Sequence, residues 1–262
     1  MIIVNVYVLF EPIMVPRLPT VESSEEVNEE EYGIKKMTAI EKRKSIRKRL
    51  PEWFKTSLPI GEAQKKFNQA RDNVREHGLN TVCEEARCPN IHDCWGRGTA
   101  TFMIAGEVCT RGCKFCAVGT VKRPDKLDEN EPKELANSIK RMGLKYAVIT
   151  VVNRDDLEDG GARHYKKCII EVKKENPDIG LELLCSDLDG NIDALEMLLE
   201  ELPLKVFAHN VECVPRLDSK VRDSRASFEQ SLEILKMARK LRPDIKIKSS
   251  LMVGLGETDE EI

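Results

Sequence analysis

Hydrophobic positions recur along the chain at two different spacings, and these spacings predict where helices and strands lie. Between residues 61 and 77 apolar side chains return every three or four positions, which is typical of an amphipathic helix. Farther along, continuous apolar runs rich in β-branched residues predict buried parallel strands. Five such strands are expected, at residues 99–107, 146–152, 181–185, 206–211 and 245–253.

Between the predicted strands the spacing becomes helical again, and four helices are expected around residues 132–143, 165–172, 191–202 and 228–241. Pro132 and Asn191 stand at favourable helix starts, whereas Pro177 stops the second helix. Strands that alternate with helices predict βαβ units and a parallel sheet with right-handed crossovers. The expected fold class is α/β, a partial or full barrel whose functional side chains gather at the carboxyl ends of the strands.

The composition is that of a globular protein, and it restricts the classes of function. The chain has 262 residues, of which 41% are hydrophobic and 33% are charged. Lys and Arg number 42 against 45 Asp and Glu, so no bulk positive charge is available to hold a nucleic-acid backbone. Aromatic residues make up only 5%, which disfavours a base-stacking surface. We therefore expect no nucleic-acid partner.

The first 55 residues divide into an apolar, an acidic and a basic stretch. Residues 1–15 are apolar but interrupted by Glu11 and Pro12, and a membrane helix needs about 20 apolar residues. No Lys or Arg precedes Arg17, whereas a secretory signal begins with basic residues. We expect no membrane association, a cytoplasmic location and a disordered extension over residues 1–34. The basic stretch that follows is either a solvated linker or, at residues 42–48, a docking surface for an acidic partner.

Cysteines carry the clearest chemical signal, because six of the nine lie between residues 83 and 116. Cys109, Cys113 and Cys116 form a C-x3-C-x2-C triplet directly after the first predicted strand. Three closely spaced thiolates can bind three irons of a cubane cluster and leave the fourth iron open to a substrate. The alternative is zinc, but a closed structural zinc site needs four ligands, and the next candidate downstream is His164.

A second triplet lies upstream, at Cys83, Cys88 and Cys94 with the spacing C-x4-C-x5-C. Alone it would fit zinc equally well, but beside the first triplet it indicates a second iron–sulfur cluster. His92 lies inside this triplet, where it is either a ligand or, as we expect, an exposed loop residue.

The segment TVCEEARCPNIHDCWGRGTATFMIAGEVCTRGCKFCAVGT joins both triplets and closely resembles the lipoyl synthase family of the radical S-adenosylmethionine (SAM) superfamily. The resemblance continues in PEWFKTSLP, NRDDLEDGGARHY, HNVECVPRL, ASFEQSLEILKMA and KSSLMVGLGETDEEI, and so covers residues 51–262. It implies a partial barrel of the radical SAM type over residues 99–262, preceded by a cluster-bearing extension. Residues 35–98 would then comprise the basic linker, the first helix and the auxiliary-cluster segment.

The resemblance also implies a reaction and its cofactors. Lipoyl synthases insert two sulfur atoms at C6 and C8 of a protein-bound octanoyl-lysine, and they use SAM and two 4Fe–4S clusters. The cluster on Cys109, Cys113 and Cys116 would generate the radical, and the auxiliary cluster on Cys83, Cys88 and Cys94 would supply the sulfur. The implied partners are octanoylated lipoyl carrier domains, namely the acyltransferase subunits of 2-oxoacid dehydrogenases and the glycine cleavage H protein. An electron donor such as ferredoxin or flavodoxin is also implied.

Candidate cofactor-binding residues lie at the ends of the second and fourth predicted strands and within the fifth, in segments that resemble the family: Arg154, Asp155, Asn210, Glu212, Lys248 and Ser250. An arginine can bind a carboxylate through two parallel hydrogen bonds. The alternative interpretation is a turn stabilised by Asp and Gly after the second strand, and an ordinary polar strand end at the fourth.

The chain departs from the family at its carboxyl end. Thr258 and Glu261 form a capping box, which predicts the start of a helix, yet only Ile262 follows in the sequence. The family's Arg-Ser-Ser-Tyr motif, whose serine is the fourth auxiliary ligand, does not occur in the sequence. We expect a truncated form that lacks its last strand and helix, leaves the edge of the 245–253 strand unpaired and does not turn over. The alternatives are another sulfur-inserting radical SAM enzyme, such as a methylthiotransferase or a relative of biotin synthase, or an inactive metal-binding module.

Overall fold

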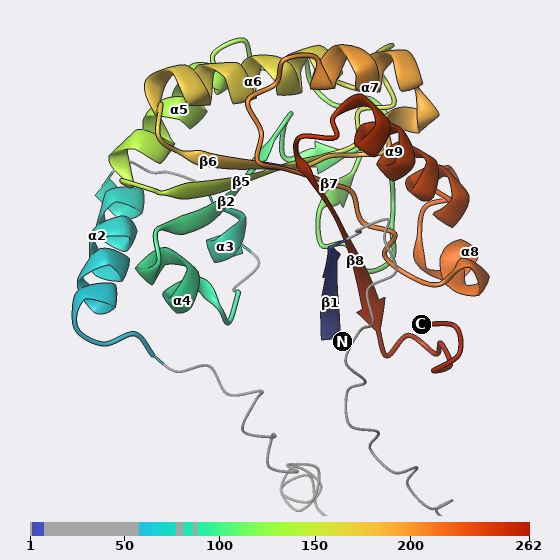
Figure 1. Ribbon diagram of the computed structural model, residues 1–262, viewed down its shortest axis with the longest axis horizontal. Helices are drawn as coiled ribbons and strands as arrows, with labels where there is room; N and C mark the ends of the chain where they lie inside the picture. The colour runs from blue at the N-terminus through green and yellow to red at the C-terminus, as the bar shows by residue number, and fades with distance from the viewer. Residues whose placement is uncertain (1, 8–57, 77–80, 86–87) are drawn as a thin grey trace, which may run out of the picture. The chain divides into compact units, whose positions relative to one another are not determined.

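A twisted six-stranded sheet forms the centre of the computed structural model, which describes residues 2–7, 58–76, 81–85 and 88–262 (Figure 1). The strand order is β1-β8-β7-β6-β5-β2. Five neighbouring strands are parallel: β2 (Thr99–Ile104), β5 (Tyr146–Val151), β6 (Gly180–Leu184), β7 (Val206–Ala208) and β8 (Lys246–Val253). All five lie where the hydrophobic runs predict strands, and the α/β partial-barrel class is confirmed.

The predicted helices lie in sequence between the parallel strands and cover one face of the sheet (Figure 1). They are α5 (Glu131–Arg141), α6 (Ala162–Glu175), α7 (Ile192–Leu199) and α9 (Phe228–Leu241). Asn191 caps α7 as predicted, because its side-chain oxygen accepts the N–H of Ala194 at 2.9 Å. On α6 the buried residues recur at helical spacing, so that one face packs inward.

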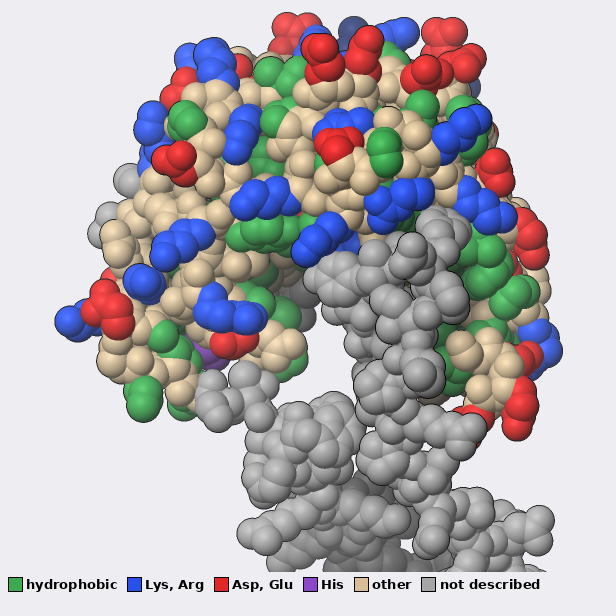
Figure 2. Space-filling model, viewed as in Figure 1, with side chains coloured by type: hydrophobic (Ala, Val, Ile, Leu, Met, Phe, Trp, Pro, Cys, Tyr) green, Lys and Arg blue, Asp and Glu red, His purple; other side chains and the backbone are tan. Residues whose placement is uncertain are grey.

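The core lies between these helices and the sheet. Ile149, Leu183 and Phe207, on three neighbouring strands, are completely buried. Each such side chain stabilises the fold by about 1.5–3 kcal/mol relative to an exposed position. The outer face is polar: Figure 2 shows Lys and Arg side chains interspersed with Asp and Glu over the upper part of the molecule.

Further helices and strands lie outside the alternating pattern of strands and helices. Helix α2 (Glu62–Glu76) packs on α4 (Ile91–Gly96), while α3 (Val82–Glu85) and α4 both contact β2. Two-residue strands, β3 (Val108–Cys109) and β4 (Gly119–Thr120), pair with each other, and α8 (Asp218–Val221) precedes α9. Hydrophobic spacing predicts α2 but not α3 or α4, because four to six residues are too few to show a helical period. No helix among the described residues is long and apolar enough to cross a membrane.

The prediction of a disordered extension over residues 1–34 is wrong for its first residues. Strand β1 (Ile2–Tyr7) pairs antiparallel with β8, from Ile2 opposite Val253 to Tyr7 opposite Lys248. The expected unpaired edge of the fifth strand is therefore also wrong. The physical reason is that an open strand edge offers a row of free N–H and C=O groups, and the IIVNVY segment has strong β propensity. The boundary at residue 34 and the basic stretch at 42–48 lie outside the described residues.

Candidate active site

A cavity of about 280 Å³ opens at the carboxyl ends of β5, β6 and β7, where function is expected in a barrel of this type. Its walls combine strand ends with the loop that carries the first cysteine triplet. Cys109, Cys113 and Cys116 line it, as do Asn153, Asp187 and His209. Met103, Val152 and Leu184 supply apolar wall. The cavity thus joins a thiol-rich side to a mixed polar and apolar side.

Backbone N–H groups point at two of the three loop sulfurs. The amides of Arg111 and Asn153 donate to Cys109 Sγ at 3.4 and 3.3 Å, and the amide of Asp223 donates to Cys113 Sγ at 3.3 Å. Hydrogen bonds to sulfur are one of the means by which proteins hold and tune iron–sulfur clusters. The donor set therefore fits cluster ligation at this triplet. In the chain without metal, burial raises the pKa of the Cys113 thiol, and the Asp223 amide partly opposes this.

A buried arginine at the second position after Cys109 anchors this loop. The Arg111 guanidinium donates hydrogen bonds to the Asp155 carboxylate, the two shortest at 2.7 and 3.0 Å. It donates another to Asp187 at 2.6 Å. Its side chain is 3% exposed and that of Asp187 is 1% exposed. Burial alone would lower the pKa of Arg111, but the two carboxylates raise it overall. These ion pairs therefore hold the cysteine loop against the residues that follow β5 and β6.

Two further residues hold the same loop from the segment between α8 and α9. The carboxylate of Asp223 accepts the N–H of Gly112 at 2.8 Å. Arg225 donates to the carbonyl of Thr110 at 2.6 Å and to Asp155 at 3.2 Å. The bond from Arg225 lowers the pKa of Asp223 well below its usual range. Sequence reasoning missed Arg111, Asp223 and Arg225, because no local spacing links residues more than 40 positions apart.

Asn210 and Glu212, two of the predicted cofactor-binding residues, line the cavity. Burial raises the pKa of Glu212, and a hydrogen bond from the side chain of Asn210 partly opposes the shift. Glu212 also has a φ of +66°, which is uncommon for a residue with a side chain. Its backbone is held there by β8, since its N–H donates to the carbonyl of Ser250 at 3.1 Å. Strain of this kind is often found at functional sites.

Arg154 and Asp155 lie beside the cavity but are engaged by the protein itself. Arg154 is 2% exposed and binds Asp156 through two parallel bonds of 2.8 Å. Burial raises the pKa of Asp155, but the bonds from Arg111 and Thr110 outweigh it, so the pKa is lowered overall. These contacts show that Arg154 and Asp155 support the loop, and the cofactor contacts predicted for them from the sequence stay predictions.

Lys248 and Ser250 do not line the cavity either. Lys248 Nζ donates to Glu182 at 2.7 Å, and the Tyr146 hydroxyl donates to the same carboxylate at 3.1 Å. Lys248 lies near the amino end of β8 and Glu182 near the middle of β6. In the sheet register Lys248 is level with Ala208, the last residue of β7, so a cofactor contact for Lys248 stays a prediction.

We expect Lys248→Met to lower stability without changing SAM binding. The substitution leaves the Glu182 carboxylate, 7% exposed, without its cation, which costs on the order of 3 kcal/mol when a buried pair loses one partner. Urea unfolding gives the free energy, and equilibrium dialysis gives the affinity for SAM. A large loss of SAM affinity at unchanged stability would restore the cofactor role of Lys248.

A buried hydrogen-bond chain forms the floor of the cavity at His209. Its Nδ1–H donates to the carbonyl of Cys185 at 2.9 Å, and this assigns Nε2 as the acceptor of the Ser231 hydroxyl at 3.0 Å. Ser231 in turn accepts a bond from Arg222 at 2.8 Å. Burial lowers the pKa of His209, while the bond to Cys185 and the charge of Asp187 partly oppose the shift. The imidazole is therefore held neutral.

This arrangement predicts a pH dependence of stability. Unfolded histidine has a pKa of about 6.5, and His209 in the fold lies lower, so the unfolded chain takes up a proton first as the pH falls. The contribution of His209 to stability is present above pH of about 6.5 and is lost as the pH falls toward the lowered pKa. We expect the free energy of unfolding to drop less between pH 7 and pH 5 in His209→Asn than in the parent. Parallel curves for the two proteins would contradict this.

The second triplet lies on and between two short helices. Cys83 is on α3 and Cys94 on α4, and the Cys83 thiol is close enough to contribute to the raised pKa of Cys94. The amide of Cys88 donates to the carbonyl of Cys83 at 3.0 Å, which closes the turn between them. Burial raises the pKa of Cys94, and Arg97 partly opposes this.

Two side chains near this triplet were not predicted correctly from the sequence, namely His92 and Trp95. His92 is not an exposed loop residue: it is half-buried on α4, with its ring centroid 4.4 Å from that of Phe67. Trp95 follows Cys94 and is 1% exposed, and its Nε1 is the only buried side-chain N or O in the described part of the chain without a hydrogen-bond partner. A buried donor without a partner calls for an explanation, and the preceding residue, Cys94, is the last member of the second triplet.

Comparison with known proteins agrees with this geometry. The family model of the Radical SAM superfamily matches residues 103–262, and that of the N-terminal domain of lipoyl synthase matches residues 20–88. The chain is 50% identical over 218 residues to a lipoyl synthase of Halorhodospira halophila, covering 83% of this chain and 64% of that protein. It is 49% identical over 228 residues to the mitochondrial lipoyl synthase of Bos taurus, covering 85% of this chain and 60% of that protein.

The chain therefore spans less than two thirds of the length of these curated relatives. Among solved structures, a crystal structure of methylornithine synthase aligns with a TM-score of 0.42 and 17% identity, covering 71% of this chain and 50% of that one. The superfamily match extends over more than half of the chain and includes the three-cysteine loop on the cavity wall. This chain belongs to the radical SAM superfamily, and along most of its length it is similar to lipoyl synthases.

Proposed function

We propose that this chain acts as a lipoyl synthase, inserting sulfur at C6 and C8 of an octanoyl-lysine on a carrier protein, in place of the lack of turnover expected from the missing Arg-Ser-Ser-Tyr motif. The observation that carries the proposal is the presence of two cysteine triplets in one compact unit, with the first on the wall of a cavity at the carboxyl ends of three parallel strands. The similarity to lipoyl synthases covers both triplets. Another sulfur-inserting radical SAM enzyme is the alternative, and nothing in the comparisons favours it.

The first triplet is proposed to hold the radical-generating 4Fe–4S cluster, with SAM in the cavity. When bound, the two groups together supply a carbon-centred radical that can remove hydrogen from an unactivated C–H bond. The chain's own residues hold and enclose them. Arg111, Asp223 and Arg225 fix the loop, and the apolar wall excludes water. Asn210 and Glu212 present polar atoms where the ribose or methionyl part of SAM would lie.

The second triplet is proposed to hold an auxiliary 4Fe–4S cluster that serves as the sulfur source. Cys83, Cys88 and Cys94 would be its ligands, and the Trp95 indole N–H is placed in the adjoining core as a donor. The His92 ring lies against that of Phe67, and we do not assign it as a ligand.

The proposed partners follow from the reaction. They are octanoylated carrier domains of 2-oxoacid dehydrogenases, the glycine cleavage H protein and a low-potential electron donor such as ferredoxin or flavodoxin. We also propose a cytoplasmic location. The basic residues 42–48 remain a proposed docking surface for an acidic carrier, whose contribution should weaken with salt because charges are screened over about 8 Å at physiological ionic strength.

The test is anaerobic reconstitution of the chain with iron and sulfide, followed by incubation with SAM, reductant and an octanoylated carrier. Two cubanes correspond to about eight irons per chain. Mass spectrometry of the carrier should then show two sulfur atoms gained and two hydrogens lost, while 5′-deoxyadenosine accumulates. A carrier lacking the octanoyl group is the control. Deoxyadenosine without any sulfur on the octanoyl carrier would reject lipoyl synthesis, and zinc bound without sulfide would favour a metal-binding module.

A further inference from the structure

The chain leaves β2 through a turn that an ordinary residue rarely adopts. Ala105 has a φ of +71° and Gly106 a φ of +106°, and Ala105 is 1% exposed. Left-handed backbone is unfavourable for a residue with a Cβ, so this conformation persists only where its surroundings hold it. Four residues beyond Ala105 comes Cys109, the first ligand of the proposed radical cluster. The turn therefore sets the direction in which the cysteine loop begins.

Charged side chains hold both backbone polar groups of Ala105. Its N–H donates to the two carboxylate oxygens of Glu131, at 2.9 and 3.2 Å. Its carbonyl accepts a bond from Arg154 Nη1 at 3.2 Å, and the same guanidinium donates to the carbonyl of Asp125 at 2.9 Å. Hydrogen bonds with one ionised partner are about twice as strong as neutral ones. The strained turn is thus fixed from two sides.

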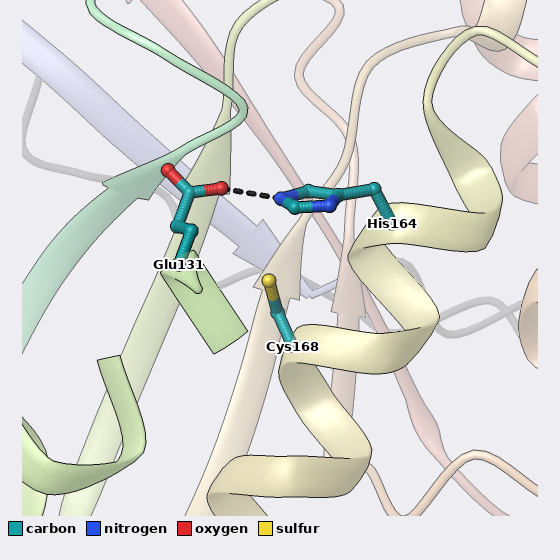
Figure 3. Close-up of side chains that lie close together, drawn as sticks. All are labelled: Glu131, His164 and Cys168. Carbon is teal, nitrogen blue, oxygen red and sulfur yellow. Dashed lines mark hydrogen bonds and ion pairs between the residues drawn. The ribbon is translucent and has the colours of Figure 1, made fainter. Parts of the chain in front are cut away.

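Glu131 is itself oriented by the next helix. His164 Nε2 and the Glu131 carboxylate form a hydrogen bond, and the thiol of Cys168 lies one helical turn farther along α6, facing the pair (Figure 3). The ligand atoms of the three side chains all lie within 4.8 Å of one another. His164 and Cys168 are both buried. The first residue of α5 and the first turn of α6 therefore meet at the turn that leads into the cysteine loop.

We propose that Glu131, oriented by His164, is a positioning residue for the radical-cluster loop. It keeps Ala105 in its left-handed conformation and so places Cys109 with respect to Cys113 and Cys116. The carboxylate satisfies the Ala105 N–H while His164 prevents it from swinging toward solvent. The inference rests on the cluster site proposed for the first triplet but not on the octanoyl substrate. It assigns to the outer helices α5 and α6 a direct influence on cluster geometry.

The test compares Glu131→Leu, Glu131→Gln and His164→Leu with the parent, all reconstituted anaerobically. Glu134→Gln, at an exposed position one turn along α5, is the matched control. The readouts are iron content, the EPR spectrum of the reduced cluster with and without SAM, and the rate of reductive SAM cleavage. None of them needs a carrier protein, so a failure of the lipoyl proposal would not affect the result. A double variant, Glu131→Leu with Ala105→Gly, adds a rescue, because glycine adopts a positive φ without strain.

We expect Glu131→Leu to bind iron but to show an altered EPR response to SAM and at least tenfold slower cleavage. Glu131→Gln, which keeps an acceptor for the Ala105 amide, should lie between it and the parent, and Ala105→Gly should restore part of the loss. If Glu131→Leu does not fold, the Gln and His164→Leu variants decide. Parent-like spectra and rates in those variants would overturn the proposal. Stoichiometric zinc in the parent that is lost on replacing Glu131 or Cys168 would also overturn it, because the three side chains would then be a metal site.

Discussion

We expect Cys113→Ala to abolish reductive cleavage of SAM, whereas Cys88→Ala should leave cleavage intact and stop sulfur insertion. Cys113 lies on the cavity wall and receives an N–H bond from Asp223, in a loop whose three thiols face one site. A cubane with only two protein ligands is not retained in a form that binds SAM, so no electron reaches the sulfonium. Cys88 does not line that cavity and belongs to the separate second triplet.

The measurements are deoxyadenosine formation by chromatography and the mass of the octanoylated carrier. Cys213→Ala is the control, because it removes a buried thiol that belongs to neither triplet and whose Sγ–H donates to Asp218. Undiminished sulfur insertion by Cys88→Ala would contradict the assignment of the auxiliary cluster. Undiminished SAM cleavage by Cys113→Ala would contradict that of the radical cluster.

Replacing Arg111 by methionine should produce the largest loss of stability among the substitutions considered at the site. The variant leaves the carboxylate of Asp187, 1% exposed, and that of Asp155, 12% exposed, without their shared cation. Breaking a buried ion pair by removing one partner typically costs 3–5 kcal/mol, roughly a third or more of the stability of an ordinary domain. The folded-state pKa of Asp155, now low, should rise as well.

Urea unfolding of the cluster-free chain at pH 7 measures this loss. Adding Asp187→Asn to Arg111→Met removes one of the stranded charges, so the double variant should be more stable than the single one. Gln230, which donates to Asp187 at 2.8 Å, keeps a partner in that variant. A loss below about 1 kcal/mol in Arg111→Met would show that water replaces the guanidinium and that the loop does not depend on this pair.

Much of the fold follows from local patterns. The order of strands and helices, the cap at Asn191 and the two cysteine triplets are all properties of short segments, and the structure places them as predicted. Strand β2 ends earlier than predicted, at Ile104 instead of residue 107, because the backbones of Ala105 and Gly106 have positive φ. Gly106 permits the turn, but the side chains that hold Ala105 in it come from α5 and from the loop after β5, far along the chain.

Tertiary structure decided the roles of the charged residues. Arg111 and Asp187 are 76 positions apart, and Gly112 and Asp223 are 111 apart, so no spacing along the chain connects them. Lys248 lies in a sequence segment that resembles the family, yet its side chain pairs with Glu182, two strands away in the sheet. β1 joins the sheet because β8 offers it an open edge, a partner that its own residues do not identify. Periodicity determines the elements, and cysteine spacing predicts the ligand sets, because both act over a few residues. Which charges meet, and which face the cavity, depends on strand register and helix packing, and these exist only once the chain has folded.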